Sequence, residues 1–338
     1  MRRLGQKATP GGRDDERERG VVAPVAALLM VALLGFGALA VDVGAMYSEK
    51  AQLQNGADSA ALAVADICAK APMSARCPAD QKTQATPYAN GNALDGHSNV
   101  VSAVVDNAAG TADVKTETPA SAGGEHFSLY LARALGINSV EIQATAQARW
   151  KYPTTGRAVL PLVFATCEFK DDHSPHKILT HGGGHGAPDC NSSNPSGQII
   201  PGGFAWLKPD GSTGCNVTAT IGQWSATSAG GSIPTGCDAL FNASLLGKTV
   251  ALPVYGYTCT GILSPCTGSN VKYMIQKWAG FKVLGWSFPS NNAGPTGVFG
   301  PGESGLYGTF VGYSADPSLF TGDSSTSTGN VVVLGLTK

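Results

Sequence analysis

The residues best suited to chemistry gather in one short segment, HSPHKILTHGGGHGAPDC, which ends at Cys190. This segment contains His173, His176, His181 and His185, most of the chain's 6 histidines. Imidazole and thiolate groups at such density can bind zinc, although these spacings match no standard zinc motif. The segment therefore has two interpretations: a metal site built on the four histidines or, as we favour, a solvated loop between two disulfide cysteines.

No familiar catalytic motif accompanies the histidines. The run HGGG that begins at His181 resembles the oxyanion loop of lipases, but that class needs a serine in the pattern G-x-S-x-G, which the sequence lacks. The sequence also lacks a P-loop, a dinucleotide-binding fingerprint and a C-x-x-C pair. We therefore expect a protein that is not an enzyme and needs no cofactor.

The chain's 8 cysteines favour disulfides in an oxidising compartment, because all of them follow the hydrophobic segment described next. The disulfide candidates are Cys68, Cys77, Cys167, Cys190, Cys215, Cys237, Cys259 and Cys266. Close spacing favours pairing Cys68 with Cys77 and Cys259 with Cys266. Spacing gives weaker support to the pairs Cys167 with Cys190 and Cys215 with Cys237, and it does not fix the connectivity.

Residues 21–41, VVAPVAALLMVALLGFGALAV, carry no charged side chain. As a helix rising about 1.5 Å per residue they span roughly 32 Å, which matches a hydrocarbon core of about 30 Å. A cleaved secretory signal has an apolar region of only about 7–15 residues, so we favour a retained transmembrane helix. Residues 1–20 are rich in Arg and Lys, whereas residues 42–61 hold only Lys50. The positive-inside rule predicts a cytoplasmic tail at residues 1–20 and an extracytoplasmic bulk.

Helical periodicity continues beyond the span, over residues 42–71. Five apolar side chains recur there at alternating intervals of four and three residues, and polar side chains lie between them. This helix contact face consists of Leu53, Ala57, Ala60, Val64 and Ile67. Its small side chains let another element approach closely. The face can pack on the protein's own globular part, meet a partner in an assembly, or do both.

These two helical halves carry a specific set of landmarks. They are Arg19 and Gly20 before the apolar run, the DVG triplet from Asp42, Tyr47, the LQN triplet from Leu53 and the run ADSAALA from Ala57. In order and spacing they resemble the N-terminal segment of the Tad (tight adherence) Flp pilus-assembly family, the TadE/TadG-like group. The resemblance implies a single-pass anchor in a bacterial cell envelope that works with other pilus-assembly or membrane proteins.

The sequence departs from the family's prepilin-type members at one position. Those members are cut after a glycine and carry a glutamate five residues further on. Here Gly20 occupies the cleavage position, but Val25 stands where the glutamate would be. The TadG-like branch lacks this glutamate as a rule, so the chain is closest to the N-terminal region of that branch. We expect an uncleaved anchor that does not enter a pilus shaft.

The exported region divides into two predicted parts and completes an α+β fold. Residues 72–152 are expected to form a small α/β part, and residues 157–338 a β-rich, disulfide-stapled domain in which short apolar runs alternate with turns. Periodicity within the first part predicts helices at 79–94 and 125–135 and strands at 99–105, 111–115 and 139–150.

Aromatic residues are frequent in the last domain, and exposed aromatics can bind sugars. We favour core packing for this set, which comprises Trp206, Trp224, Trp278, Trp286, Tyr255, Tyr257 and Tyr273. The net charge of −1 gives no reason to expect a nucleic-acid partner.

We expect a membrane-anchored, exported, non-enzymatic component of Flp/Tad-type pilus assembly or secretion. It would lie in the bacterial cell membrane as a single-pass protein, and its partners would be the lipid bilayer and other pilus-assembly or membrane proteins. The alternative is a membrane-tethered binding protein or adhesin whose β-rich head recognises a glycan or another surface ligand.

Overall fold

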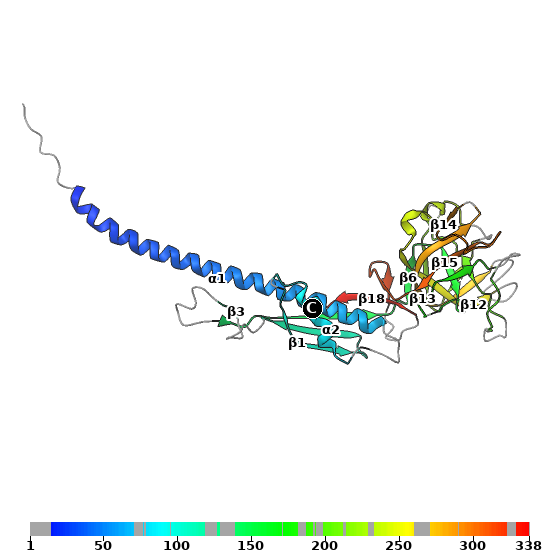
Figure 1. Ribbon diagram of the computed structural model, residues 1–338, viewed down its shortest axis with the longest axis horizontal. Helices are drawn as coiled ribbons and strands as arrows, with labels where there is room; N and C mark the ends of the chain where they lie inside the picture. Colours follow the sequence, from blue (N-terminus) through cyan, green and yellow to red (C-terminus); the bar gives the residue numbers. More distant parts are fainter. Residues whose placement is uncertain are drawn as a thin grey trace, which may run out of the picture.

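The computed structural model has an elongated α+β architecture (Figure 1). It describes residues 15–70, 77, 79–94, 96–118, 127–128, 139–170, 172–181, 187–191, 193, 199–211, 214–228, 233–259, 271–289, 291–322 and 329–337. One long helix projects from the body, a sheet lies against the inner half of that helix, and a β-rich head follows at the opposite end.

The long helix, α1 (Asp15–Lys70), contains 56 residues. It confirms the single helix predicted from the span and its extension, but it begins inside the segment predicted as the tail. Pro24 consequently lies within the helix, where its missing N–H removes one main-chain hydrogen bond. The helix ends two residues before Pro72, because a proline disfavours helical backbone in the residue that precedes it.

The first sheet has the strand order β1-β2-β5-β18-β16. Its strands are β1 (Asn99–Asp106), β2 (Thr111–Glu117), β5 (Gln143–Lys151), β18 (Val331–Leu336) and β16 (Tyr313–Ala315). All neighbours pair antiparallel except β16 and β18, which are parallel. The β1–β2 hairpin confirms the two strands predicted around a turn. Two strands from the domain predicted at residues 157–338, β16 and β18, thus pair within this first sheet.

Alternation along β5 explains how this sheet receives the helix. Ala144, Ala146 and Ala148 are buried, whereas Thr145 and Arg149 are exposed on the other face. The strand predicted at residues 139–150 is therefore confirmed over β5, whereas Ser139–Val140 forms a separate strand in another sheet. Its small inward side chains allow α1 and the short helix α2 (Gln81–Asn90) to cover the sheet closely.

The head is built on an eight-stranded sheet with the main order β8-β15-β13-β12-β7-β9. Its strands are β7 (Leu162–Ala165), β8 (His176–Leu179), β9 (Phe204–Trp206), β11 (Trp224–Ala226), β12 (Thr249–Cys259), β13 (Lys272–Phe288), β14 (Asn291–Ala293) and β15 (Gly305–Phe310). A three-stranded sheet consists of β6 (Thr155–Ala158), β10 (Val217–Thr220) and β17 (Phe320–Thr321). The predicted β-rich head is confirmed.

The core of the head is largely aromatic. Phe164 is fully buried, and its ring centroid lies 5.0 Å from that of Phe281 and 5.5 Å from that of Phe310. A second group joins Trp206 to Phe288 at 5.4 Å. These contacts are spaced as favourable aromatic pairs are, so the head has a substantial core besides its disulfides.

Three disulfides confirm predicted pairs: Cys68–Cys77, Cys167–Cys190 and Cys215–Cys237. Cys259 is also disulfide-bonded. Its predicted partner, Cys266, lies outside the described residues.

One predicted helix differs from the structure. The described part of residues 125–135 is a strand, β3 (Phe127–Ser128), which pairs antiparallel with β4 (Ser139–Val140). Cross-strand pairing here overrides a helical periodicity that was read from the local sequence alone. The other residues of that predicted helix lie outside the described part of the chain.

Candidate functional site

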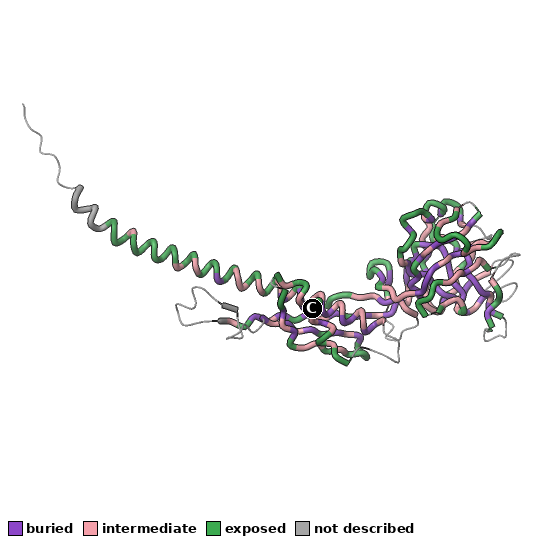
Figure 2. Tube along the Cα trace, in the orientation of Figure 1, coloured by how far each residue is buried: buried purple, intermediate pink, exposed green. Residues whose placement is uncertain are grey.

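The outer half of α1 is the chain's largest exposed apolar surface among the described residues. Leu28, Leu34 and Phe36 are 72%, 73% and 71% exposed, and most of this half is coloured as exposed in Figure 2. By length and composition, α1 is also the one described helix able to cross a membrane. A helix with apolar side chains on all faces and no protein around it fits a lipid environment.

The inner half of α1 is buried by the chain itself. Leu53, Ala57, Ala60 and Val64 are at most 1% exposed, and they pack with residues of β2, β5 and β18 in one core. Ile67 is half-buried. The periodic stripe thus packs on the protein's own globular part, which was one of its two predicted uses, and its four most buried members offer no surface to a partner.

Polar contacts fix the register of α1 on the sheet. The buried Thr116 hydroxyl donates to the carbonyl oxygen of Leu53 at 2.9 Å. The Gln54 amide donates to the carbonyl oxygen of Thr145 at 3.1 Å, on the neighbouring strand. Together these bonds specify one position of the helix along the sheet, which apolar packing alone would specify less sharply.

The two helices approach closely at Gly56. A Cβ placed on this glycine would lie 3.1 Å from the carbonyl oxygen of Ala89 in α2. One turn further on, the Ser59 hydroxyl is 3.2 Å from the carbonyl oxygen of Tyr88. Only a glycine gives α2 this position without displacement, so Gly56 is a packing residue and not a hinge.

The last turn of α1 is tied to the chain that leads to the head. Asp66 forms an ion pair with Lys70 at 2.7 Å and accepts a hydrogen bond from the Ser314 hydroxyl of β16. The Tyr152 hydroxyl donates to the carbonyl oxygen of Ala69 at 3.0 Å. The last turn of α1 is therefore held by side-chain contacts to β16 of the first sheet and to the residue after β5, where the chain leaves that sheet for the head.

The histidine segment does not form a metal site within the described residues. His176 has each ring nitrogen near a main-chain carbonyl oxygen, of Ser174 at 3.2 Å and of Glu168 at 3.1 Å. His173 and His181 are exposed, and His185 lies outside the described residues. No group of three or more His, Cys, Asp or Glu side chains that could hold a metal ion occurs in the described part of the chain.

Most of the aromatic residues considered for ligand binding belong to the core. Trp206, Trp278, Trp286, Tyr255 and Tyr273 are at most 3% exposed. Trp224 and Tyr257 are half-buried.

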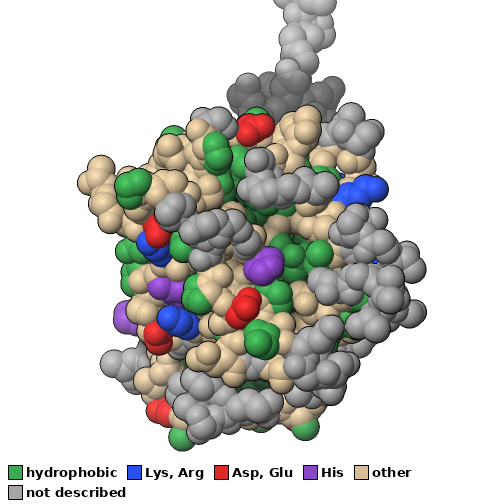
Figure 3. All heavy atoms as spheres, turned by 90° about the vertical axis from the view of Figure 1, so that its right-hand side faces the viewer, with side chains coloured by type: hydrophobic (Ala, Val, Ile, Leu, Met, Phe, Trp, Pro, Cys, Tyr) green, Lys and Arg blue, Asp and Glu red, His purple; other side chains and the backbone are tan. Residues whose placement is uncertain are grey.

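An open hollow beside β13, of about 590 Å³, is lined by residues that include Tyr257, Met274 and Lys277. The Lys277 ammonium lies 4.9 Å from the ring centroid of Phe169, and burial lowers the pKa of this lysine. On the face of the head in Figure 3, the described charged side chains are scattered among uncharged ones. These features define no ligand class.

The exposed apolar helix α1 fits a single-pass membrane protein. A model of the family described as putative Flp pilus-assembly TadE/G-like matches residues 20–66. This match covers the candidate span and most of the part of α1 that packs on the first sheet, and it confirms the resemblance of that segment. Comparisons with curated proteins and with solved structures gave no match.

Some functional features were not visible in the sequence. The contact of Asp66 with Ser314 and that of Ala69 with Tyr152 join residues far apart in the chain, and no local pattern marks them. The placement of Val140 and Ile142 opposite Met46 is likewise a product of tertiary packing. On the buried face of β2, Thr116 follows the apolar Ala112 and Val114. Its hydroxyl was a weak sequence signal for a buried hydrogen bond.

Proposed function

We propose that this protein is a membrane-anchored, non-enzymatic component of a Flp/Tad-type pilus-assembly or secretion apparatus. The observation that carries the proposal is the family match over residues 20–66. The exposed apolar half of α1 and the disulfides in the remainder of the chain support an anchor with an exported head. In this proposal residues 1–20 lie in the cytoplasm and the remainder beyond the span is extracytoplasmic.

The structure narrows how such a component can meet its partners. The first sheet covers the helix contact face from Leu53 to Val64. Contacts of α1 with other membrane proteins would therefore be made by residues 22–41. Gly35 and Gly37 have open space where a Cβ would stand. Glycines, like the alanines elsewhere in this span, allow a second helix to approach closely. The head, attached at the end of α1, is the second surface available to partners.

The alternative is a tethered binding protein or adhesin, and it has less support. The aromatic side chains that suggested glycan binding are mostly in the core. Half-buried Tyr257 and Trp224 remain as candidates. Binding of the full chain to a glycan array, lost on Tyr257→Ala, would favour this alternative.

The test is a gene deletion in the source bacterium with complementation. We expect loss of surface pili or of the associated secretion, seen by electron microscopy, and restoration by the native chain. A chain whose residues 22–41 are replaced by a polyleucine span of the same length is the matched variant. It keeps the anchor and removes the small residues of the span, the glycines among them, so we expect it to restore the phenotype poorly. Normal pili after deletion would contradict the proposal.

A further inference from the structure

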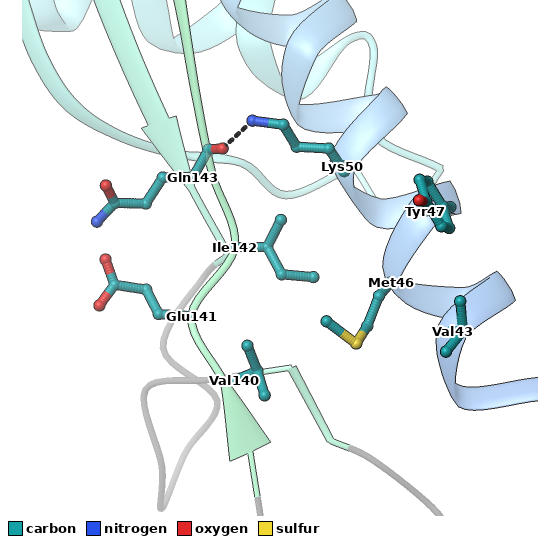
Figure 4. Close-up of a pocket in the computed structure, with 8 residues that line it drawn as sticks. All are labelled: Val43, Met46, Tyr47, Lys50, Val140, Glu141, Ile142 and Gln143. Carbon is teal, nitrogen blue, oxygen red and sulfur yellow. Dashed lines mark hydrogen bonds between the residues drawn. The ribbon is translucent and has the colours of Figure 1, made fainter. Parts of the chain in front are cut away.

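A groove lies on α1 directly after the candidate span, with a volume of about 410 Å³ (Figure 4). One wall is a single face of the helix, at spacings of three, one and three residues. The other wall is the segment that leads from β4 into β5. The lining residues are Val43, Met46, Tyr47 and Lys50 on the helix and Val140, Glu141, Ile142 and Gln143 opposite.

The inside of this groove is apolar. Val140 and Ile142 point toward α1, whereas the side chains of Glu141 and Gln143 point away from it (Figure 4). Met46 faces the two apolar residues across the gap. The groove is also open, because Val43 and Tyr47 remain 42% and 74% exposed.

The groove has one apolar end and one cationic end. Val43 and Val140 lie at the end nearer the span, and Lys50 lies at the other. The Lys50 ammonium donates to the carbonyl oxygen of Gln143, which holds the charge at that end. Polarity therefore changes along the groove in the same direction as it does in a membrane leaflet, from hydrocarbon to head group.

The position along α1 also matches the head-group layer. At about 1.5 Å per residue, Val43 and Tyr47 lie roughly 3 Å and 9 Å beyond Val41. The interfacial region of one leaflet is about 5–8 Å thick. Lys50 lies further out, and the Gln143 carbonyl holds its ammonium there, so a bound head group would meet this charge at the outer side of the layer.

We propose that the groove binds one phospholipid of the leaflet through which α1 leaves the membrane. The upper acyl chain and glycerol would pack against Met46, Val140 and Ile142, and the phosphate would lie at Lys50. A pocket of this size falls within the range of about 300–1,000 Å³ typical of small-ligand sites. A lipid is favoured over a second copy of the chain because the groove continues the surface of the span. The inference rests on membrane insertion of residues 21–41 and not on a role in pilus assembly.

Photo-crosslinking of the full chain in lipid nanodiscs tests this site. The discs contain phosphatidylcholine and a minor fraction of phosphatidylglycerol that carries a diazirine near the glycerol end of one acyl chain. We expect mass spectrometry to find the label on peptides covering residues 43–50 and 140–143, and on the span. Lys50→Gln should lower groove labelling about fivefold, the equivalent of the roughly 1 kcal/mol that one basic residue contributes near an anionic surface.

Two further variants separate binding from folding. Tyr47→Asp changes an exposed side chain, leaves the core intact and should reduce groove labelling without changing labelling of the span. Val104→Asp, on the exposed outer face of β1, is the matched control and should change neither. Label confined to residues 21–41 and equal in every variant would overturn the proposal that the groove binds a lipid, but it would agree with the membrane anchor. A chain unlabelled everywhere would contradict both the groove and the membrane anchor.

Discussion

The Tyr152 hydroxyl donates a buried hydrogen bond of 3.0 Å to the carbonyl oxygen of Ala69. Carbonyl groups in the last turn of a helix have no partner within that helix. Tyr152 follows β5, at the point where the chain leaves the first sheet for the head. The Tyr152 side chain thus gives the Ala69 carbonyl a hydrogen-bond partner. It also fixes the start of the segment that links the first sheet to the head.

Removing this hydroxyl should loosen the end of the helix. We expect Tyr152→Phe to lower the free energy of unfolding by about 1 kcal/mol, because the ring remains and one hydrogen bond is lost. Urea unfolding of the full chain in detergent, followed by tryptophan fluorescence, measures the effect. Tyr88→Phe changes an exposed ring and should leave the unfolding midpoint unchanged. Equal midpoints for both variants would contradict this role of Tyr152.

The close contact of Gly56 with Ala89 predicts a strong steric effect. Gly56→Leu should displace α2 and lower the free energy of unfolding by about 1–3 kcal/mol, as overpacking does elsewhere. Ala51→Leu places the same side chain on an exposed position of α1 and is the control. Hydrogen exchange of α2 amides should rise in the Gly56 variant alone. Unchanged exchange would show that α2 does not pack on α1 in this way.

The Cys68–Cys77 disulfide should stabilise the end of α1. Replacing both cysteines with alanine should cost about 2–4 kcal/mol of unfolding free energy, since a cross-link restricts the unfolded chain. Unreduced peptide mapping should recover this pair together with Cys167–Cys190 and Cys215–Cys237. The same map tests whether Cys259 pairs with Cys266. Free thiols at Cys68 or Cys77 in exported protein would contradict the structure.

Burial of Tyr273 predicts a loss of stability at high pH. Burial raises the pKa of its phenol to about 12. Unfolding returns this pKa to about 10, so the contribution of Tyr273 to stability is fully present below about pH 10 and is lost as pH rises through about 12. Urea midpoints measured across this range should fall less steeply for Tyr273→Phe than for the native chain. Parallel curves would mean that the ring is accessible to solvent.

The sequence predicted the elements that depend on local periodicity. The stripe from Leu53 to Val64, the strand with Ala144 and Ala146 and the hairpin around residues 106–110 all have side-chain periods that match their observed structure. Such patterns report which face is buried, because each face repeats along one element. They do not report what covers that face.

The remaining features depend on contacts between distant segments. The insertion of β18 beside β5 could not be predicted, because an apolar run such as VVVLGL fits either sheet equally well. Phe127 and Ser128 lie in a helical pattern, yet they pair with Ser139 and Val140. The groove beside Met46 arises only when β4 and β5 are placed against α1. For the same reason the choice between the two uses of the Leu53 stripe required the structure.

The membrane anchor with an exported head is tested most directly by labelling lysines in intact cells with a membrane-impermeant amine reagent. Exposed Lys208 and Lys248 report on the head, and Lys7 reports on the N-terminal tail. The account predicts labelling of Lys208 and Lys248 in intact cells, labelling of Lys7 only after permeabilisation, and recovery of all three in one membrane-bound chain. Labelling of Lys7 in intact cells, protection of the head lysines, or release of the head without residues 1–20 would contradict it.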